Sequence, residues 1–223
     1  MERYSRDEVV LVAYHLHIPY PDPMTNPSTL ARAEACGVRG TPSYAIDGAM
    51  TSGGGGREKA DHYYNKLNSM IEARLVEPAR ARIQLDTSCK DGIVNTKVTV
   101  DNVTGESSEL RLQIALVEEE LSYSGQSVLR FHPMVVRSLG GEGNRGFVID
   151  PSKKTITEHS FNLKEITEGL ETHLDETEKE RKMKLTQKKH EIDREKLSVV
   201  AFIRDTEKSV VLQSAFSRVN IEK

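Results

Sequence analysis

The sequence has few cysteines, no tryptophan, no long apolar run and no excess of charge of either sign. Its 223 residues include two cysteines, and 31 lysines and arginines stand against 34 aspartates and glutamates, for a net charge of −3. This even balance lacks the basic footprint of a nucleic-acid-binding protein. No apolar run approaches the roughly 18 residues that a membrane-spanning helix needs, and no signal-peptide pattern opens the sequence. The composition that remains is that of a globular protein with one large domain or two small ones.

The two cysteines, Cys36 and Cys89, have neither zinc-binding nor redox spacing. Cys36 ends an expected helix, and Cys89 lies near the end of an expected strand. We expect two free thiols, one of them packed and the other near a loop. A disulfide between them is the alternative, and it requires their Cα atoms to lie within about 7 Å.

Strand and helix patterns alternate in the first 78 residues. The near-continuous apolar run from Val9 to Tyr14 predicts a strand buried on both faces of a parallel or mixed sheet. Asn26 is a good N-cap and Pro27 a good first helical residue, so we expect a helix over about 27–36. Gly37 can end that helix in the left-handed conformation. Three elements follow a Gly-Thr-Pro loop: a short strand over 43–46, a hairpin turn at Asp47-Gly48 and an amphipathic helix from Arg57 to Pro78.

Two features of this part could bind a ligand. Four glycines, Gly53–Gly56, precede the second helix, where backbone N–H groups can hold a phosphate. Arg57-Glu58 does not supply the Lys-Ser/Thr pair of the usual P-loop, and a simple connection is the favoured interpretation. His15 and His17 project to one face of their strand, as metal ligands can. No third ligand has suitable spacing, so hydrogen-bonded strand-end histidines are favoured and we expect no metal.

The sequence pattern changes after Pro78, where polar and apolar residues alternate over short segments. The pattern Val94, Thr96, Val98 against Asn95 and Lys97 indicates half-buried antiparallel strands. Strands are expected at 81–85, 93–100, 110–117, 156–163, 199–204 and 210–219. This number and spacing of strands favour a β-sandwich of the immunoglobulin-like type.

The sandwich is expected to be interrupted twice. The segment from Phe131 to Arg137 is interpreted as an irregular excursion. The charged stretch near 163–182 predicts a helical insertion, and a short strand could follow at Met183 and Leu185. A run of mixed charge is most often a solvated face, and a peptide- or protein-docking surface is the alternative.

The chain as a whole resembles bacterial secreted and outer-membrane lipoproteins in which an immunoglobulin-like domain follows a thioredoxin-like domain. Two segments carry the resemblance most clearly: the loop Gly37-Val38-Arg39-Gly40-Thr41-Pro42, and the closing strand Val199-Val200-Ala201-Phe202-Ile203-Arg204-Asp205. It implies an α+β protein of two domains. Residues 1–78 are then a truncated thioredoxin-like α/β layer, and residues 79–223 are the antiparallel sandwich.

The resemblance also implies which chemistry is missing. In that family a cis-proline loop faces a Cys-x-x-Cys motif, and the matching loop positions here are Thr41 and Pro42. Only eight residues precede Val9, so the active-site half of the fold is expected to be absent. Dithiol exchange needs an attacking thiolate and a resolving thiol. Cys36 lies at a helix C-terminus, where the helix dipole disfavours an anion, so it is not expected to act as a lone nucleophile.

Two functions from different classes follow. In the first, the chain is part of an extracytoplasmic thiol-disulfide oxidoreductase and is non-catalytic as it stands. In the second, it is a redox-inactive binding or structural module of the bacterial cell envelope. Both place the protein outside the cytoplasm, need no cofactor and predict a protein or peptide partner rather than nucleic acid. An exposed sheet edge in an incomplete fold also predicts self-association of this chain.

Overall fold

The computed structural model describes residues 3–52, 57–105, 107, 109–125, 129–141 and 145–222. Within these ranges the protein is a mixed α+β fold with three α-helices and several sheets. The glycines Gly53–Gly56, considered above as a phosphate-binding loop, lie outside the described residues.

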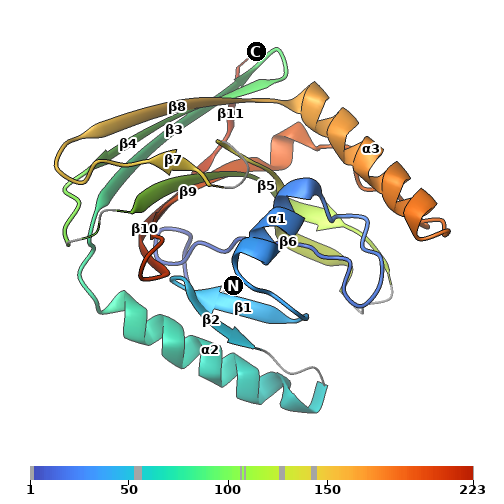
Figure 1. Cartoon of the computed structure of the whole chain (residues 1–223), viewed down its shortest axis with the longest axis horizontal. Coiled ribbons are helices and arrows are strands. Elements are labelled where there is room, and N and C mark those ends of the chain that lie inside the picture. Colours follow the sequence, from blue (N-terminus) through green and yellow to red (C-terminus); the bar gives the residue numbers. More distant parts are fainter. Residues whose placement is uncertain are drawn as a thin grey trace.

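Two β-sheets packed face to face form the larger part of the molecule (Figure 1). The first has the strand order β11-β3-β4-β8, and the second has the order β10-β9-β5-β6, with β7 also paired to β5. The first sheet contains β3 (Arg82–Lys90), β4 (Ile93–Asp101), β8 (Thr155–Asn162) and β11 (Asn220–Ile221). The second contains β5 (Leu110–Ser122), β6 (Phe131–Leu139), β7 (Phe147–Val148), β9 (Leu197–Asp205) and β10 (Val210–Arg218). Pairing is antiparallel except between β11 and β3.

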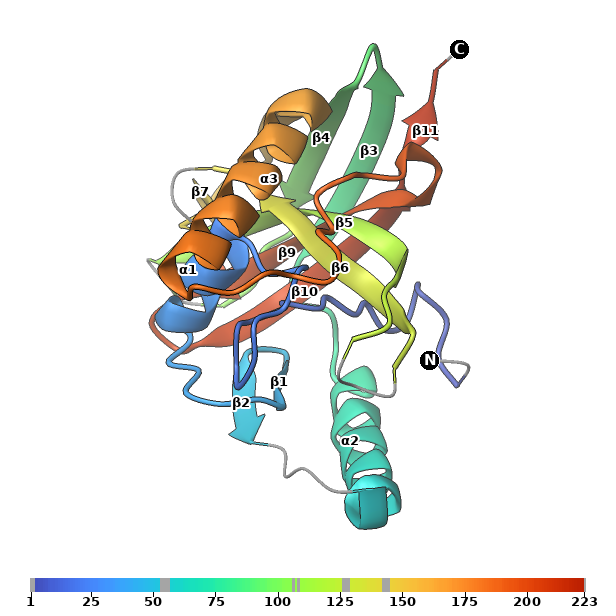
Figure 2. The same cartoon turned by 90° about the vertical axis from the view of Figure 1, so that its right-hand side faces the viewer.

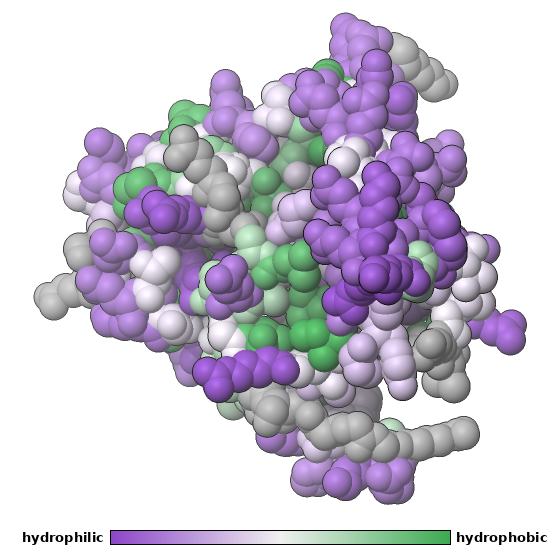
Figure 3. Space-filling model, turned by 45° about the vertical axis from the view of Figure 1, so that its right-hand side comes forward, coloured by the Kyte–Doolittle hydropathy of each residue, from purple (hydrophilic) through white to green (hydrophobic). Residues whose placement is uncertain are grey.

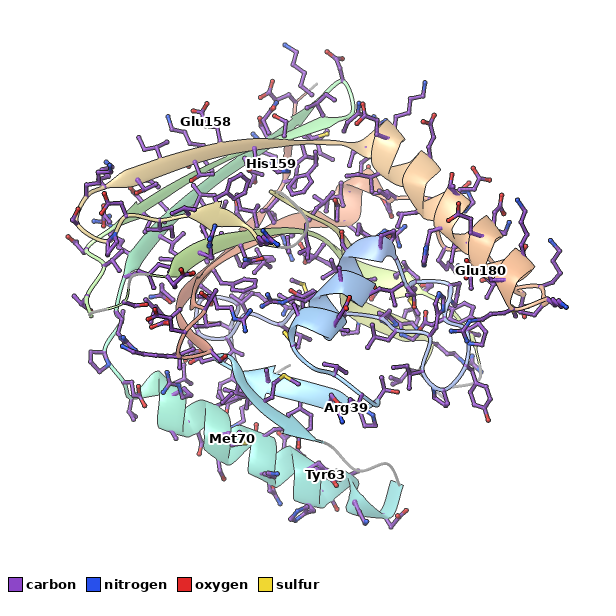
Figure 4. All side chains as sticks on the ribbon, in the orientation of Figure 1. Arg39, Tyr63, Met70, Glu158, His159 and Glu180 are labelled. Carbon is purple, nitrogen blue, oxygen red and sulfur yellow. The ribbon has the colours of Figure 1, made fainter. Side chains whose placement is uncertain are left out.

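The main core lies between the two sheets because alternate residues of each strand point inward. Val94 and Val98 of β4 face Ile114 of β5 and Ile203 of β9, and all four side chains are fully buried. The alternation is visible along β8 in Figure 4, where Glu158 points to solvent and His159 points toward the opposite sheet. The antiparallel strands expected after Pro78 are thus present, several of them longer than the sequence pattern predicted.

A second apolar layer covers the outer face of the five-stranded sheet. Val117, Met134 and Phe202 belong to this face, and Val10, Val12 and Tyr14 are among the side chains packed on it. The helix α1 (Pro27–Ala35) lies on the same side, next to β6 (Figure 2). The five-stranded sheet is therefore buried on both of its faces.

The first expected strand is absent as a strand. Residues from Val9 to Tyr14 are extended, but Ala13 alone forms a β-bridge, with Val135 at the edge of β6. The apolar side chains of this segment pack on the outer face of the sheet instead of joining a parallel sheet of their own. A continuous apolar run suits a strand inside a sheet and also an extended segment packed on the face of a sheet. The composition does not distinguish the two, so the prediction of a strand was wrong.

The remaining early elements agree with the sequence pattern. α1 begins after Asn26, whose side chain accepts a hydrogen bond from the Thr29 N–H, and Gly37 follows it with φ of 65°. The hairpin of β1 (Ser43–Ile46) and β2 (Ala49–Ser52) turns at Asp47-Gly48. A 3-10 turn η1 (Arg57–Lys59) leads into α2 (Ala60–Leu75), which carries Tyr63 and Met70 below the sandwich in Figure 4.

Two expectations for the later residues were wrong and one was right. The expected irregular segment from Phe131 to Arg137 is part of the regular strand β6, whose pairing with β5 shifts register between Leu116 and Val117. The charged helix is α3 (Leu163–Glu180), close to the predicted range. No strand follows at Met183 and Leu185; that part of the chain is irregular as far as η2 (Arg194–Lys196).

The irregular segment after α3 is attached to the sandwich through a buried arginine. Arg137 of β6 is 2% exposed, and its Nη2 lies 2.7, 3.0 and 3.0 Å from the carbonyl oxygens of Lys189, His190 and Glu191. Its Nε is 3.6 Å from a carboxylate oxygen of Glu118. Burial lowers the pKa of Arg137 and raises that of Glu118, while each charge opposes the effect on the other.

The N-terminal layer is attached at the edge of β6. The Ala13 N–H donates to the Met134 carbonyl at 2.9 Å, and the Val136 N–H donates to the Ala13 carbonyl at 3.0 Å. Next to this bridge, Nδ2 of the buried Asn26 donates to the Val136 carbonyl at 2.8 Å. Asn26 therefore caps α1 and holds the helix against β6.

We expect Asn26→Ala to lower the free energy of unfolding by about 2–3 kcal/mol, because it removes a helix cap and leaves a buried carbonyl unpaired. Asn162→Ala is the matched control, since Asn162 caps the N-terminus of α3 at an exposed site. That substitution should cost only about 1 kcal/mol. Urea unfolding of both variants measures the difference, and equal losses would show that the contact with β6 contributes nothing.

Candidate functional site

A groove of about 590 Å³ separates the N-terminal layer from one end of the five-stranded sheet. Its walls are the segment Val10–Leu16, the end of α1 and the β1–β2 hairpin, and its floor comes from β9 and β10. The volume lies within the roughly 300–1,000 Å³ of ordinary ligand pockets. On the face drawn in Figure 3, apolar side chains gather near the centre and hydrophilic side chains surround them.

The floor of the groove follows from the alternation of β9. Val199, Ala201 and Ile203 point into the core between the sheets, so Val200, Phe202 and Arg204 point to the outer face. Two apolar side chains and one arginine therefore meet the groove from consecutive outward positions of β9.

Two walls of the groove are extended segments with one free side each. Between Val10 and His15, only Ala13 makes backbone hydrogen bonds to other described backbone groups, and its partners lie on β6. Across the groove, β1 pairs with β2 on one side and with no described strand on the other. Ser43, Tyr44 and Ala45 of β1 line the groove. Extended backbone with free hydrogen-bonding groups is a template for an added strand.

Polar groups gather at the end of the groove near α1. The guanidinium carbon of Arg32 lies 5.6 Å from the ring centroid of Phe202, in cation–π range. Burial raises the pKa of Tyr14, and the nearby charges of Arg32 and Arg204 oppose that rise. The Tyr44 hydroxyl is buried without a hydrogen-bond partner among the described residues. Two arginines and two tyrosines therefore contribute hydrogen-bond donors to the lining of the groove.

The structure brings together two of the four residues that the sequence singled out. Cys36 and Thr41 both line the groove, and the Thr41 hydroxyl donates to the Ile18 carbonyl at 2.7 Å. Pro42 follows a cis peptide bond and is exposed beside the groove rather than in its lining. Cys89 lies in the core between the sheets, 3% exposed.

Both cysteines are free thiols, one packed and one near a loop, as expected from their spacing. The alternative, a disulfide between the two parts of the chain, is therefore wrong. No dithiol centre forms in the part of the chain that the structure describes, because Cys36 lies at the groove and Cys89 between the sheets.

Sequence reasoning missed the arginines of the groove. Arg32 was one of several charges on a short helix, and Arg204 was one polar position in a buried strand. The alternation of side chains along β9 could have placed Arg204 on the outer face of the sheet. That placement indicates a functional position only when the outer face is known to be covered by another layer.

The two histidines considered as metal ligands form hydrogen bonds instead. His15 Nδ1 lies 2.8 Å from Oδ2 of Asp22, and His17 Nδ1 accepts a hydrogen bond from the Asp22 N–H at 3.0 Å. His132 packs edge-on against His15, and His173 stacks on His17. Among the described residues, no three His, Cys, Asp or Glu side chains are placed to hold a metal ion.

The stacked pair is set to remain uncharged at neutral pH. Burial, the charge of Arg181 and the proximity of His173 lower the pKa of His17 to about 4, and Asp22 opposes this effect. Burial also lowers the pKa of His132 and of His173. This cluster joins the loop after residue 15 to the far end of α3.

No protein-family model matches the sequence, and no curated protein matches it. A solved structure, that of a domain of the outer membrane lipoprotein Omp28 from Porphyromonas gingivalis, is similar to 66% of this chain and to 94% of its own chain. The TM-score is 0.38 and the sequence identity is 14%. At these values the likeness establishes neither a family nor a function. In the described part of the chain, no helix combines the length and the apolar character needed to cross a membrane.

The histidine cluster predicts a pH-dependent stability. A histidine whose pKa is depressed on folding contributes stability that is fully present above its unfolded pKa and is lost as the pH falls through the folded value. For His17 that window runs from the ordinary histidine pKa of 6.5 down to about 4. We expect the free energy of unfolding to decrease over this range, and His17→Gln to reduce the decrease by about 2 kcal/mol.

Urea unfolding at pH 7, 5.5 and 4 measures this effect. His62→Gln is the control, because His62 is exposed on α2. Identical pH profiles for the wild type and His17→Gln would contradict the assignment.

Proposed function

We propose that these residues form a non-catalytic protein-binding module that holds an extended segment of a partner in the groove. The observation that carries the proposal is a pair of segments, Val10–Leu16 and β1, that both line the groove and whose backbone groups have few partners among the described residues. A strand that enters between them gains main-chain hydrogen bonds on both sides and places alternate side chains on Val200 and Phe202.

The position of the cysteines supports a role without redox turnover. Dithiol exchange requires a second thiol that can resolve the mixed disulfide formed by the first. Cys36 is at the groove, whereas Cys89 is packed between the sheets. A part in a thiol-disulfide oxidoreductase remains the second candidate, since Cys36 and Thr41 share the groove; a cysteine pair would then come from outside these 223 residues.

The finer architecture belongs to the same proposal. The order of helix, Gly-Thr-Pro loop, hairpin and helix supports a thioredoxin-like layer, and the sheet orders β3-β4-β8 and β10-β9-β5-β6 support an immunoglobulin-like sandwich. Placement in the bacterial cell envelope rests on the resemblance of the sequence to envelope lipoproteins. The free edges also favour self-association of the chain.

A strand-forming peptide tests the binding function. The chain contains no tryptophan, so tryptophan fluorescence reports on the peptide acetyl-WGVTVQVTV-amide alone. We expect saturable binding with a dissociation constant of about 10–100 µM, because a short peptide gains a few main-chain bonds and loses its conformational freedom. Amide exchange should become slower over residues 10–14 and 43–46.

Ala35→Phe should weaken this binding at least tenfold, because Ala35 lines the groove and is exposed enough to accept a larger side chain. Glu34→Phe is the control on the same helix, exposed and outside the groove lining. The peptide acetyl-WGVTPQPTV-amide should not bind, since its prolines cannot donate to a strand ladder. Equal binding of both peptides would refute strand insertion. Light scattering of the wild type and Ala35→Phe shows whether a second copy occupies the groove.

Redox inactivity is a separate expectation. These 223 residues should not accelerate insulin reduction by dithiothreitol above the rate without protein, and Cys36→Ser should behave as the wild type does. Turnover by the wild type that Cys36→Ser abolishes would favour the oxidoreductase candidate instead.

A further inference from the structure

The groove has a charge as well as a shape, and its charge comes from two strands and a helix. Arg32 enters from α1 and Arg204 from β9. In the register of β5 and β9, Arg111 lies directly opposite Arg204, so both project to the same outer face. Like charges at directly opposed positions repel each other, and this pair stands beside the end of the groove.

The described residues offer these arginines no carboxylate. None of Arg32, Arg111 and Arg204 has a carboxylate oxygen of a described residue within 4.0 Å. Asp47 lines the groove, but its Oδ2 accepts a hydrogen bond from Arg74 Nε at 2.9 Å. Asp205 follows Arg204 and is fully buried, with Oδ1 bound to the Lys208 N–H.

Resting on the proposed binding function, we propose that the segment held in the groove carries an acidic side chain, Asp or Glu, which pairs with Arg32 and Arg204. The groove is half enclosed and apolar along Val200 and Phe202, so a charge pair there is less screened than one in open solvent. The planar guanidinium groups suit a carboxylate in a two-point contact. Apolar residues on either side of the acid occupy the floor.

We place the carboxylate beside the Tyr14 hydroxyl. Tyr14, Arg32 and Arg204 all line the groove, and the charges of both arginines oppose the rise in the pKa of Tyr14. A carboxylate at this point accepts hydrogen bonds from the tyrosine and from both arginines. The occupant is thus an apolar strand with one acid, as distinct from a generally acidic chain.

Three peptides that differ at one residue test the proposal. In acetyl-WGVTVEVTV-amide the acid is Glu, and the other two peptides carry Gln or Lys at that position. We expect the Glu peptide to bind at least tenfold more tightly than the Gln peptide, and the Lys peptide to bind more weakly than both. The advantage of Glu should decrease between 0.05 and 0.5 M sodium chloride, because added salt screens the pair.

Arg204→Met should reduce the advantage of Glu over Gln to twofold or less, measured as the ratio of the two dissociation constants within this variant. Arg82→Met is the matched control, since Arg82 is exposed on β3 of the other sheet. The control should keep the full tenfold preference.

The outcomes separate this inference from the proposed function. Equal binding of the Glu and Gln peptides overturns the charge preference and leaves strand insertion intact. Failure of all three peptides to bind overturns both. A preference for Glu that survives Arg204→Met assigns the acid to another site and overturns the inference alone.

Discussion

The structure depends on the burial of one β-sheet on both of its faces. Strands β5 and β9 send alternate side chains into the core between the sheets and into the layer formed by residues 9–16 and α1. A sheet covered on both sides is nearly apolar throughout, which explains why Leu110–Val117 and Leu197–Ile203 contain so few exposed positions. The opposite sheet on one face and the covering layer on the other exclude solvent from most of this sheet.

The covering layer is attached to the five-stranded sheet on two sides, and residues from both attachments line the groove. Asn26 and the bridge at Ala13 hold the layer to β6. On the other side, the Asp47 carbonyl of the β1–β2 hairpin accepts a hydrogen bond from the Val211 N–H of β10 at 2.9 Å. The hairpin, the segment from Val10 to Leu16 and the strands β9 and β10 surround the space that remains between these attachments.

The sequence predicts the local elements well and their assembly poorly. The cap at Asn26, the left-handed Gly37 and the hairpin turn at Asp47-Gly48 each depend on a few neighbouring residues, so the pattern is sufficient. The run from Val9 to Tyr14 was wrongly predicted to be a strand, because apolar residues are equally suited to a buried strand and to an extended segment that packs on the face of a sheet. β6 was missed because Pro133 interrupts the usual strand signature in the sequence. Residues of α1, β1 and β9 line the groove together. No pattern within any one of these segments indicates that the three come close in the fold.

The contact of Arg137 with the segment after α3 has a consequence for how this surface can evolve. Its guanidinium binds carbonyl oxygens of Lys189, His190 and Glu191 and none of their side chains. Every residue supplies a main-chain carbonyl, so substitutions at these three positions preserve the contact. The path of this segment therefore does not depend on which side chains it carries at these three positions. Related chains can change the charge of this surface freely while one buried arginine keeps its shape.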